Sequence, residues 1–217
     1  MGIPVLILGE SGSGKSASLR NFETKDVGVF NVASKPLPFR RRLPLINGAT
    51  YQSIRDTLAK QQFKTYVIDD SQYLLAFEFF DRAKETGYNK FTDIALNFRD
   101  LINFVVRQTP SDCIVYFLHH TEFAADGTLK AKTIGKMLDE KLTVEGLFSI
   151  VLLCRGEKDK HYFVTQGEGY STAKSPMEMF PPEIDNDLKA VDTTIRDYYG
   201  LAPKHNKKNE TEGQNNA

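Results

Sequence analysis

Short apolar runs alternate along this chain with longer stretches in which apolar residues recur at helical spacing. Runs of strand length stand at residues 3–8, 27–32, 65–70, 113–118 and 149–154. Uninterrupted apolar strands are typical of a parallel sheet that is covered on both faces. Helical spacing follows at Ile94, Phe98, Leu101, Ile102 and Val105, and again at Leu188, Val191, Ile195 and Tyr198. The pattern predicts an α/β fold with a mainly parallel sheet, helices on both faces, and a ligand crevice at the carboxyl ends of the strands.

Two of the predicted connections are unusually long, at residues 32–50 and 119–133. Connections of that length are usually functional in a compact domain. Asp126 and Gly127 indicate a hairpin turn inside the second connection. We expect a single domain over residues 1–202 and a flexible tail at 203–217, because the last segment is polar throughout and cannot bury enough apolar surface.

The charged residues and the two cysteines indicate which partners and which cellular environment fit the chain. The 28 Lys and Arg residues balance 28 Asp and Glu residues, so any nucleic-acid surface has to be a local patch. Cys113 and Cys154 each lie in an apolar run, which predicts buried thiols rather than a disulfide or a metal site. No apolar stretch has the length of a membrane span and no signal segment opens the chain, so we expect a cytoplasmic protein without a membrane partner.

The strongest motif is GESGSGKS at residues 9–16, which fits the pattern GxxxxGKS directly after a predicted strand and before a helical segment. Glycines allow successive backbone N–H groups to point at phosphates, and the helix N-terminus adds partial positive charge. Lys15 would neutralise phosphate oxygens and the Ser16 hydroxyl would coordinate Mg²⁺. The alternative, a Gly/Ser-rich turn that happens to contain a lysine, is disfavoured by the combined context. The expected nucleotide-binding residues are Gly9, Glu10, Ser11, Gly12, Ser13, Gly14, Lys15, Ser16 and Ala17, with ATP and Mg²⁺ as cofactors.

A pair of carboxylates, Asp69 and Asp70, ends the run at 65–70. Asp69 would hold the water shell of Mg²⁺, and Asp70 would orient or deprotonate an attacking water. The alternative is that both residues cap a helix that begins near Ser71. The two interpretations are compatible.

Together these residues resemble the RecA-like P-loop ATPases, and within them the small ATPases of bacteriophages, including the Sak-four group of single-strand annealing recombinases. The resemblance spans roughly residues 2–200 and is carried by the segments 9–16, 67–70, 116–122, 133–153 and 172–181. It implies a RecA-like fold and an ATPase that acts on single-stranded DNA in recombination or annealing. It also implies a homo-oligomer, as a ring or filament, in the host cytoplasm, with a single-stranded-DNA-binding protein as a further candidate partner.

The resemblance also suggests roles for residues beyond the phosphate loop. In this family the strand that follows the acidic strand ends in a polar residue that senses the γ-phosphate, which favours His120 over His119, with simple loop capping as an equal alternative. The loop that follows binds single-stranded DNA in the family. Here that segment carries Lys130, Lys132 and Lys136, with Phe123 available for stacking. The alternative for these lysines is an ordinary solvated surface.

Two further basic residues and one departure complete the comparison with the family. Arg41, in the arginine run 40–42, would contact nucleic acid or a neighbouring subunit's nucleotide, unless the run is an ordinary exposed loop. Lys174 lies in a segment that resembles one reaching the γ-phosphate of an adjacent subunit. The family commonly has a catalytic glutamate after the strand corresponding to 27–32, where this chain has none. Asp70 is the preferred substitute, ahead of Glu10, and slow hydrolysis is expected.

Two other functions stay open from the sequence. One is a nucleotide-switched loader or regulator that acts through a protein partner in phage replication. The other is a small-molecule kinase, although no arginine-rich lid is apparent. Salt-sensitive binding of single-stranded DNA would favour the recombination ATPase, and phosphate transfer to an acceptor would favour the kinase.

Overall fold

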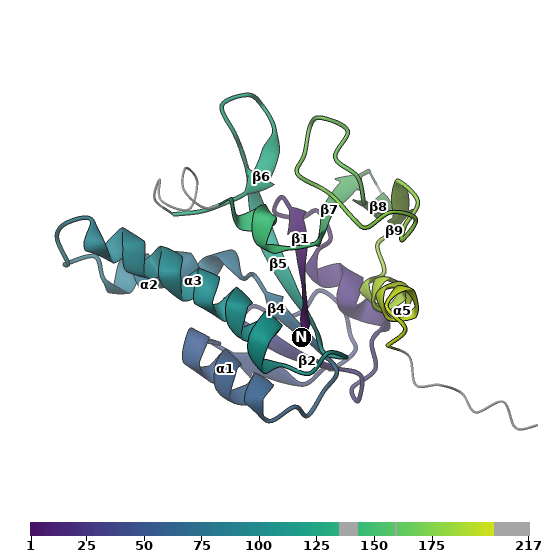
Figure 1. Ribbon diagram of the computed structural model, residues 1–217, viewed down its shortest axis with the longest axis horizontal. Coiled ribbons are helices and arrows are strands. Elements are labelled where there is room, and N and C mark those ends of the chain that lie inside the picture. Colours follow the sequence, from purple (N-terminus) through teal and green to yellow (C-terminus); the bar gives the residue numbers. More distant parts are fainter. Residues whose placement is uncertain (135–142, 159, 202–217) are drawn as a thin grey trace, which may run out of the picture.

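The computed structural model describes residues 1–134, 143–158 and 160–201, whose strands form one sheet with the order β3-β2-β4-β5-β1-β7-β8-β9 (Figure 1). The strands are β1 (Ile3–Gly9), β2 (Val27–Asn31), β3 (Leu45–Asn47), β4 (Thr65–Asp69), β5 (Ile114–Phe123), β6 (Leu129–Ala131), β7 (Ile150–Glu157), β8 (Lys160–Val164) and β9 (Glu183–Asp185). The helices are α1 (Tyr51–Ala59), α2 (Gln72–Asp81), α3 (Asn89–Gln108) and α5 (Leu188–Tyr198), with the short 3-10 helices η1 (Ser16–Asn21) and η2 (Val144–Leu147).

The six strands from β3 to β7 in the sheet order are mutually parallel. β8 and β9 extend the β7 edge in antiparallel fashion, and β6 forms a hairpin with β5. Because parallel strands present all their carboxyl ends at one edge, loops from distant parts of the sequence meet there. The predicted, mainly parallel α/β sheet is confirmed.

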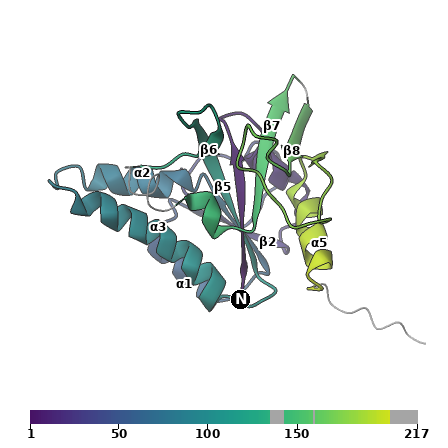
Figure 2. The ribbon, with the colours of Figure 1, turned by 45° about the horizontal axis from the view of Figure 1, so that its top comes forward.

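Helices cover both faces of the sheet, also as predicted (Figure 2). On one face, α1, α2 and α3 bury their apolar sides together with residues of β2, β4 and β5. The predicted apolar side of α3, from Ile94 to Val105, is fully buried. On the other face, η1 and α5 pack through Leu19, Val191 and Ile195. Burying both faces explains why the central strands carry uninterrupted apolar runs.

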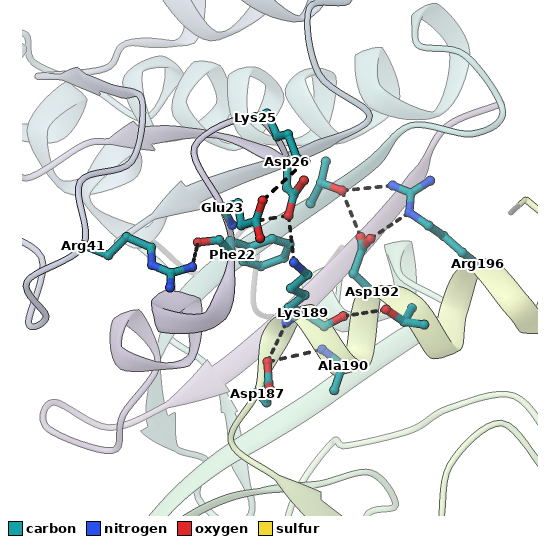
Figure 3. A network of polar contacts seen from close by, with 12 residues as sticks. Phe22, Glu23, Lys25, Asp26, Arg41, Asp187, Lys189, Ala190, Asp192 and Arg196 are labelled. Atoms are coloured by element: carbon teal, nitrogen blue, oxygen red, sulfur yellow. Dashed lines mark hydrogen bonds and ion pairs between the residues drawn. The ribbon is translucent and has the colours of Figure 1, made fainter. Parts of the chain in front are cut away.

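A buried polar network fixes α5 to the sheet at the end away from the phosphate loop (Figure 3). Asp192 accepts hydrogen bonds from the hydroxyls of Thr65 and Tyr116, both at 3.1 Å, and from Arg196 Nε at 2.7 Å. Arg196 also donates to the carbonyl of Asp112 at 2.8 Å. Since buried polar groups cost stability unless they are paired, this network sets the position of α5 against β4 and β5.

The strand predicted at 113–118 extends further than expected, so the connection at 119–133 is not a loop throughout. The segment 119–133 is largely a β-hairpin, because β5 continues to Phe123 and pairs with β6. The predicted turn is confirmed: Gly127 has a φ of 84°, and the Thr128 amide donates to Asp126 Oδ1 at 2.9 Å. His119 and His120 therefore lie inside a strand rather than in a loop after it. The apolar pattern ends early because the outer half of β5 is only partly buried.

Three remaining expectations concern the chain as a whole. Cys113 and Cys154 are both buried free thiols, as predicted. Among the helices of the described residues, none has the length and apolar character needed to cross a membrane. The polar tail expected at 203–217 lies outside the described residues.

Candidate phosphate-binding site

Strand register brings the candidate residues to one edge of the sheet. Gly9 of β1 is level with His120 of β5, and Asn31 of β2 is level with Asp69 of β4. These four strands are parallel, so their ends open toward the same side. Residues that are up to 111 positions apart in sequence, from Gly9 to His120, thus become neighbours.

The phosphate loop is closed on itself by Lys15. Its Nζ donates to the carbonyl oxygens of Gly9 at 2.7 Å and Glu10 at 2.8 Å. The side chain is buried, and burial lowers the pKa of Lys15 although nearby Asp69 and Asp70 oppose that shift. The ammonium group is therefore held inside the loop by oxygen atoms, which is the kind of partner that a phosphate oxygen can replace.

Gly14 and His161 show why the loop needs glycine at that position. Gly14 has a φ of 102°, and an added Cβ would lie 2.9 Å from the His161 ring. His161 comes from β8 and donates through Nδ1 to the Ser13 carbonyl at 2.8 Å. The loop is thus supported from outside by a neighbouring strand. A side chain at position 14 would have a strained backbone and would collide with that support.

Ser16 and Asp69 form the candidate metal-binding pair. The Ser16 hydroxyl donates to Asp69 Oδ1 at 2.8 Å, although the two residues are 53 positions apart. Burial raises the pKa of Asp69 to about 6, with the Ser16 hydrogen bond opposing the shift. A hydroxyl and a carboxylate are oxygen ligands of the kind that Mg²⁺ takes together with substrate phosphates and water. The described residues contain no cluster of three His, Cys, Asp or Glu that could hold a metal ion.

Asp70 is held between two donors. It accepts from Lys35 Nζ at 2.8 Å and from His120 Nε2 at 3.2 Å. Its φ of 62° is left-handed, a conformation that aspartate adopts more readily than most residues. Burial acts to raise the pKa of Asp70, but the hydrogen bonds from His120 and Lys35 outweigh it and hold the pKa at about 2. Asp70 is therefore a carboxylate of low proton affinity in this state.

The two adjacent histidines point to opposite faces, as strand alternation requires. His119 is fully buried against Phe98 of α3, donates through Nε2 to the Lys132 carbonyl at 2.8 Å, and lies 2.9 Å from the Ser71 hydroxyl through Nδ1. Burial lowers the pKa of His119 to about 4, so this ring is neutral. His120 is the one of the pair that faces the Asp70 carboxylate.

These side chains surround a cavity of about 370 Å³, which we call the phosphate cleft. Its lining includes the predicted residues Ser11, Gly12, Gly14, Lys15, Ser16, Ala17, Asp69, Asp70 and His120. It also includes Lys35, Pro36, Pro38 and His161, which belong to no motif of the sequence. Lys35 had a weak signal, as a basic residue just beyond a predicted strand end. For His161 we find no signal, because the β7–β8 hairpin was not predicted.

Two predicted residues lie elsewhere. Lys174 does not line the phosphate cleft, and its backbone forms an isolated bridge with Val151 of β7, with both N–O distances at 2.8 Å. Arg41 donates through Nη1 to the Phe22 carbonyl at 3.0 Å, at the end of η1 (Figure 3). Neither side chain reaches the phosphate cleft of its own subunit. A role across a subunit interface stays a prediction for both.

Of the three lysines predicted to bind single-stranded DNA, two lie within the described residues. Lys130 Nζ lies 3.4 Å from a carboxylate oxygen of Glu122, its cross-strand partner, and Lys132 is exposed. Lys136 lies outside the described residues. Phe123, at the end of β5, has 67% of its surface exposed.

A larger cleft of about 740 Å³ adjoins the phosphate loop on the side of the β5–β6 hairpin. Its lining includes the predicted loop residues Glu10 and Ser13 as well as Phe123. Among the described residues that line it, the carboxylates of Glu10, Glu157 and Glu183 outnumber the single guanidinium of Arg155. This charge balance does not favour a polyanion in the larger cleft.

No protein-family model matches the sequence, and no curated protein matches it. In structure, the chain is similar to a KaiC-like protein from the hyperthermophilic archaeon Pyrococcus horikoshii, with a TM-score of 0.47 and 14% sequence identity. The match covers 85% of this chain and 89% of that one. The geometry of the site therefore has to carry the functional argument.

Proposed function

We propose that the protein is a RecA-like P-loop ATPase that binds Mg·ATP in the phosphate cleft. The observation that carries this proposal is the Ser16–Asp69 hydrogen bond of 2.8 Å beside the buried Lys15. A phosphate loop and an acidic strand end, far apart in sequence, meet where a magnesium ion would bridge them. A glycine-rich turn without function would not need the second partner.

Each residue has a distinct task in this proposal. Backbone N–H groups of residues 9–17 bind the phosphates, and Lys15 exchanges its carbonyl partners for phosphate oxygens. Ser16 and Asp69 would hold Mg²⁺, which when bound supplies positive charge to the reacting phosphates. His120 donates to Asp70 and thereby orients the carboxylate that would position the attacking water.

Hydrolysis is proposed to be slow. A general base works best when its pKa is near the operating pH, and the hydrogen bond from His120 is the largest of the effects that hold the pKa of Asp70 at about 2 against burial. A carboxylate of such low proton affinity can orient a water but is a weak acceptor of its proton. The bound nucleotide then has time to act as a conformational signal.

The test is phosphate release from Mg·ATP by the wild type and by Lys15→Ala. The matched control is Lys25→Ala, which removes the same charge from a side chain that is 81% exposed and outside the phosphate cleft. We expect Lys15→Ala to lose about 100-fold or more in rate, as when a donor to developing charge is removed, and the control to match the wild type. Equal rates in Lys15→Ala and the wild type would refute the proposed site.

We further propose that this ATPase acts on single-stranded DNA as a homo-oligomer in phage recombination or annealing. The support is the sequence resemblance, together with the exposed residue Lys132 directly after β6, in the β5–β6 hairpin that borders the phosphate loop. Fluorescence anisotropy of a labelled single strand tests it, with and without Mg·ATP at two salt concentrations. Binding should strengthen with Mg·ATP and weaken with salt. Absence of binding would favour a nucleotide-switched loader or a kinase instead.

A further inference from the structure

The end of β2 is built to hold the main chain of Lys35. The buried amide of Asn31 donates through Nδ2 to the Lys35 carbonyl at 2.7 Å, and its Oδ1 accepts from the Lys35 N–H at 3.2 Å. The same Nδ2 donates to Asn47 Oδ1 at 2.8 Å, which ties the amide to β3. Ser34, with a φ of 56°, turns the chain back toward the sheet. One buried side chain thus fixes both backbone polar groups of an exposed lysine.

The Lys35 side chain lines the phosphate cleft. Its Nζ donates to Asp70 Oδ2 at 2.8 Å and lies 4.8 Å from the centre of the Tyr73 ring. The hydrogen bond to Asp70 raises the pKa of Lys35 despite some burial, so the group stays an ammonium ion. The side chain is 58% exposed, which means that packing does not lock it onto Asp70. It can change partners at small cost.

Two ammonium groups therefore line the phosphate cleft. Lys15 belongs to the phosphate loop and binds carbonyl oxygens. Lys35 belongs to the turn after β2 and binds a carboxylate beside the candidate metal ligand Asp69. A diphosphate seated on the phosphate loop would engage Lys15. A third phosphate would add negative charge to the same cleft, where the Lys35 ammonium group is available for a charge-assisted hydrogen bond.

We propose that Lys35 is a γ-phosphate ligand supplied by the same chain. With a triphosphate in the cleft, Lys35 leaves Asp70 and binds the γ-phosphate; with a diphosphate it stays on Asp70. The exchange makes the site discriminate ATP from ADP, and it releases one Asp70 oxygen for the attacking water. This inference rests on the proposed nucleotide-binding function and adds to it a residue that reads the third phosphate.

The experiment is calorimetric titration with Mg·AMP-PNP and, separately, with Mg·ADP. It compares the wild type with Lys35→Ala, Lys35→Met and Lys35→Arg, and uses Lys25→Ala as the charge-matched control. We expect Lys35→Ala and Lys35→Met to bind AMP-PNP about tenfold more weakly, since the new contact replaces an existing ion pair, and to bind ADP within about twofold of the wild type. Lys35→Arg should retain most of the preference, and the control should retain all of it.

The outcomes separate the two proposals. Equal weakening of both nucleotides, or no weakening of AMP-PNP, would overturn the role of Lys35 and leave the nucleotide site standing. Failure of the wild type to bind either nucleotide would overturn both. Lys35→Met keeps the aliphatic stem over Tyr73, so a selective loss shared by the alanine and methionine variants identifies the charge as the cause. Thermal melting of each variant establishes that the fold is intact.

Discussion

Asp69→Asn should make the nucleotide-free protein more stable, although it removes a candidate metal ligand. Burial raises the pKa of Asp69 from an ordinary value of about 3.9 to about 6, and the Ser16 hydrogen bond only partly opposes this. Between these two pKa values the folded state binds more protons than the unfolded state. The free energy of unfolding therefore falls as the pH rises from about 4 to about 6, and it stays lower above that range. Two pKa units at about 1.4 kcal/mol each give a penalty of about 3 kcal/mol at pH 8, and about half of that at pH 5. Asparagine keeps an acceptor for Ser16 and never ionises.

Urea denaturation without Mg²⁺ or nucleotide, at pH 8 and pH 5, measures this effect. Asp69→Asn should exceed the wild type by about 3 kcal/mol at pH 8 and by about 1.5 kcal/mol at pH 5, and should lose Mg²⁺-dependent nucleotide binding. Asp112→Asn is a control that should change the free energy of unfolding in the opposite direction. The hydrogen bond from Lys64 lowers the pKa of Asp112, so its ionised form stabilises the fold and the substitution should destabilise it. A gain that is equal at both pH values, or no gain at pH 8, would refute the reasoning.

Three other substitutions test separate parts of the structure. Gly14→Ala places a side chain on a residue with a φ of 102° and against the His161 ring. The resulting strain should lower the midpoint of thermal unfolding, measured by calorimetry, by about 2–12 °C. An unchanged midpoint would contradict this strain. Asp192→Ala removes the acceptor of buried Tyr116, and urea denaturation should show a loss of about 3 kcal/mol with nucleotide affinity unchanged. A loss below about 1 kcal/mol would show that the network is not stabilising. Lys174→Ala should slow hydrolysis and spare nucleotide binding in a titration; equal loss of both would exclude a role across the subunit interface.

The elements that the sequence predicts are those whose burial leaves a mark on composition. β1, β2, β4, β5 and β7 are central and covered on both faces, so each is an apolar run. β3 and β9 have only three residues each, and β8 begins with two exposed residues; all three lie toward the sheet edges, where exposed positions interrupt the pattern. The sequence therefore predicts the central strands of the sheet but not β3, β8 and β9.

The candidate site divides in the same way. The phosphate loop can be predicted because its glycines, lysine and serine have a fixed spacing in the sequence. Asp69 can be predicted because it stands at the end of an apolar run of strand length. Lys35 enters the phosphate cleft from the turn after β2 and His161 enters it from β8, so only the folded chain places them. The choice between His119 and His120 depends on knowing that both lie in β5, where neighbouring side chains face opposite ways. A segment taken for a loop gives no such alternation.

Equilibrium binding of a fluorescent ATP analogue to the wild type and to Lys15→Ala, with and without Mg²⁺, tests the central claim most directly. The account predicts that Mg²⁺ strengthens binding to the wild type, because Ser16 and Asp69 hold the ion against the phosphates. It predicts binding about 100-fold weaker in Lys15→Ala, whose phosphate loop has lost its buried ammonium group. No binding to the wild type, or equal binding to both proteins regardless of Mg²⁺, would contradict the account.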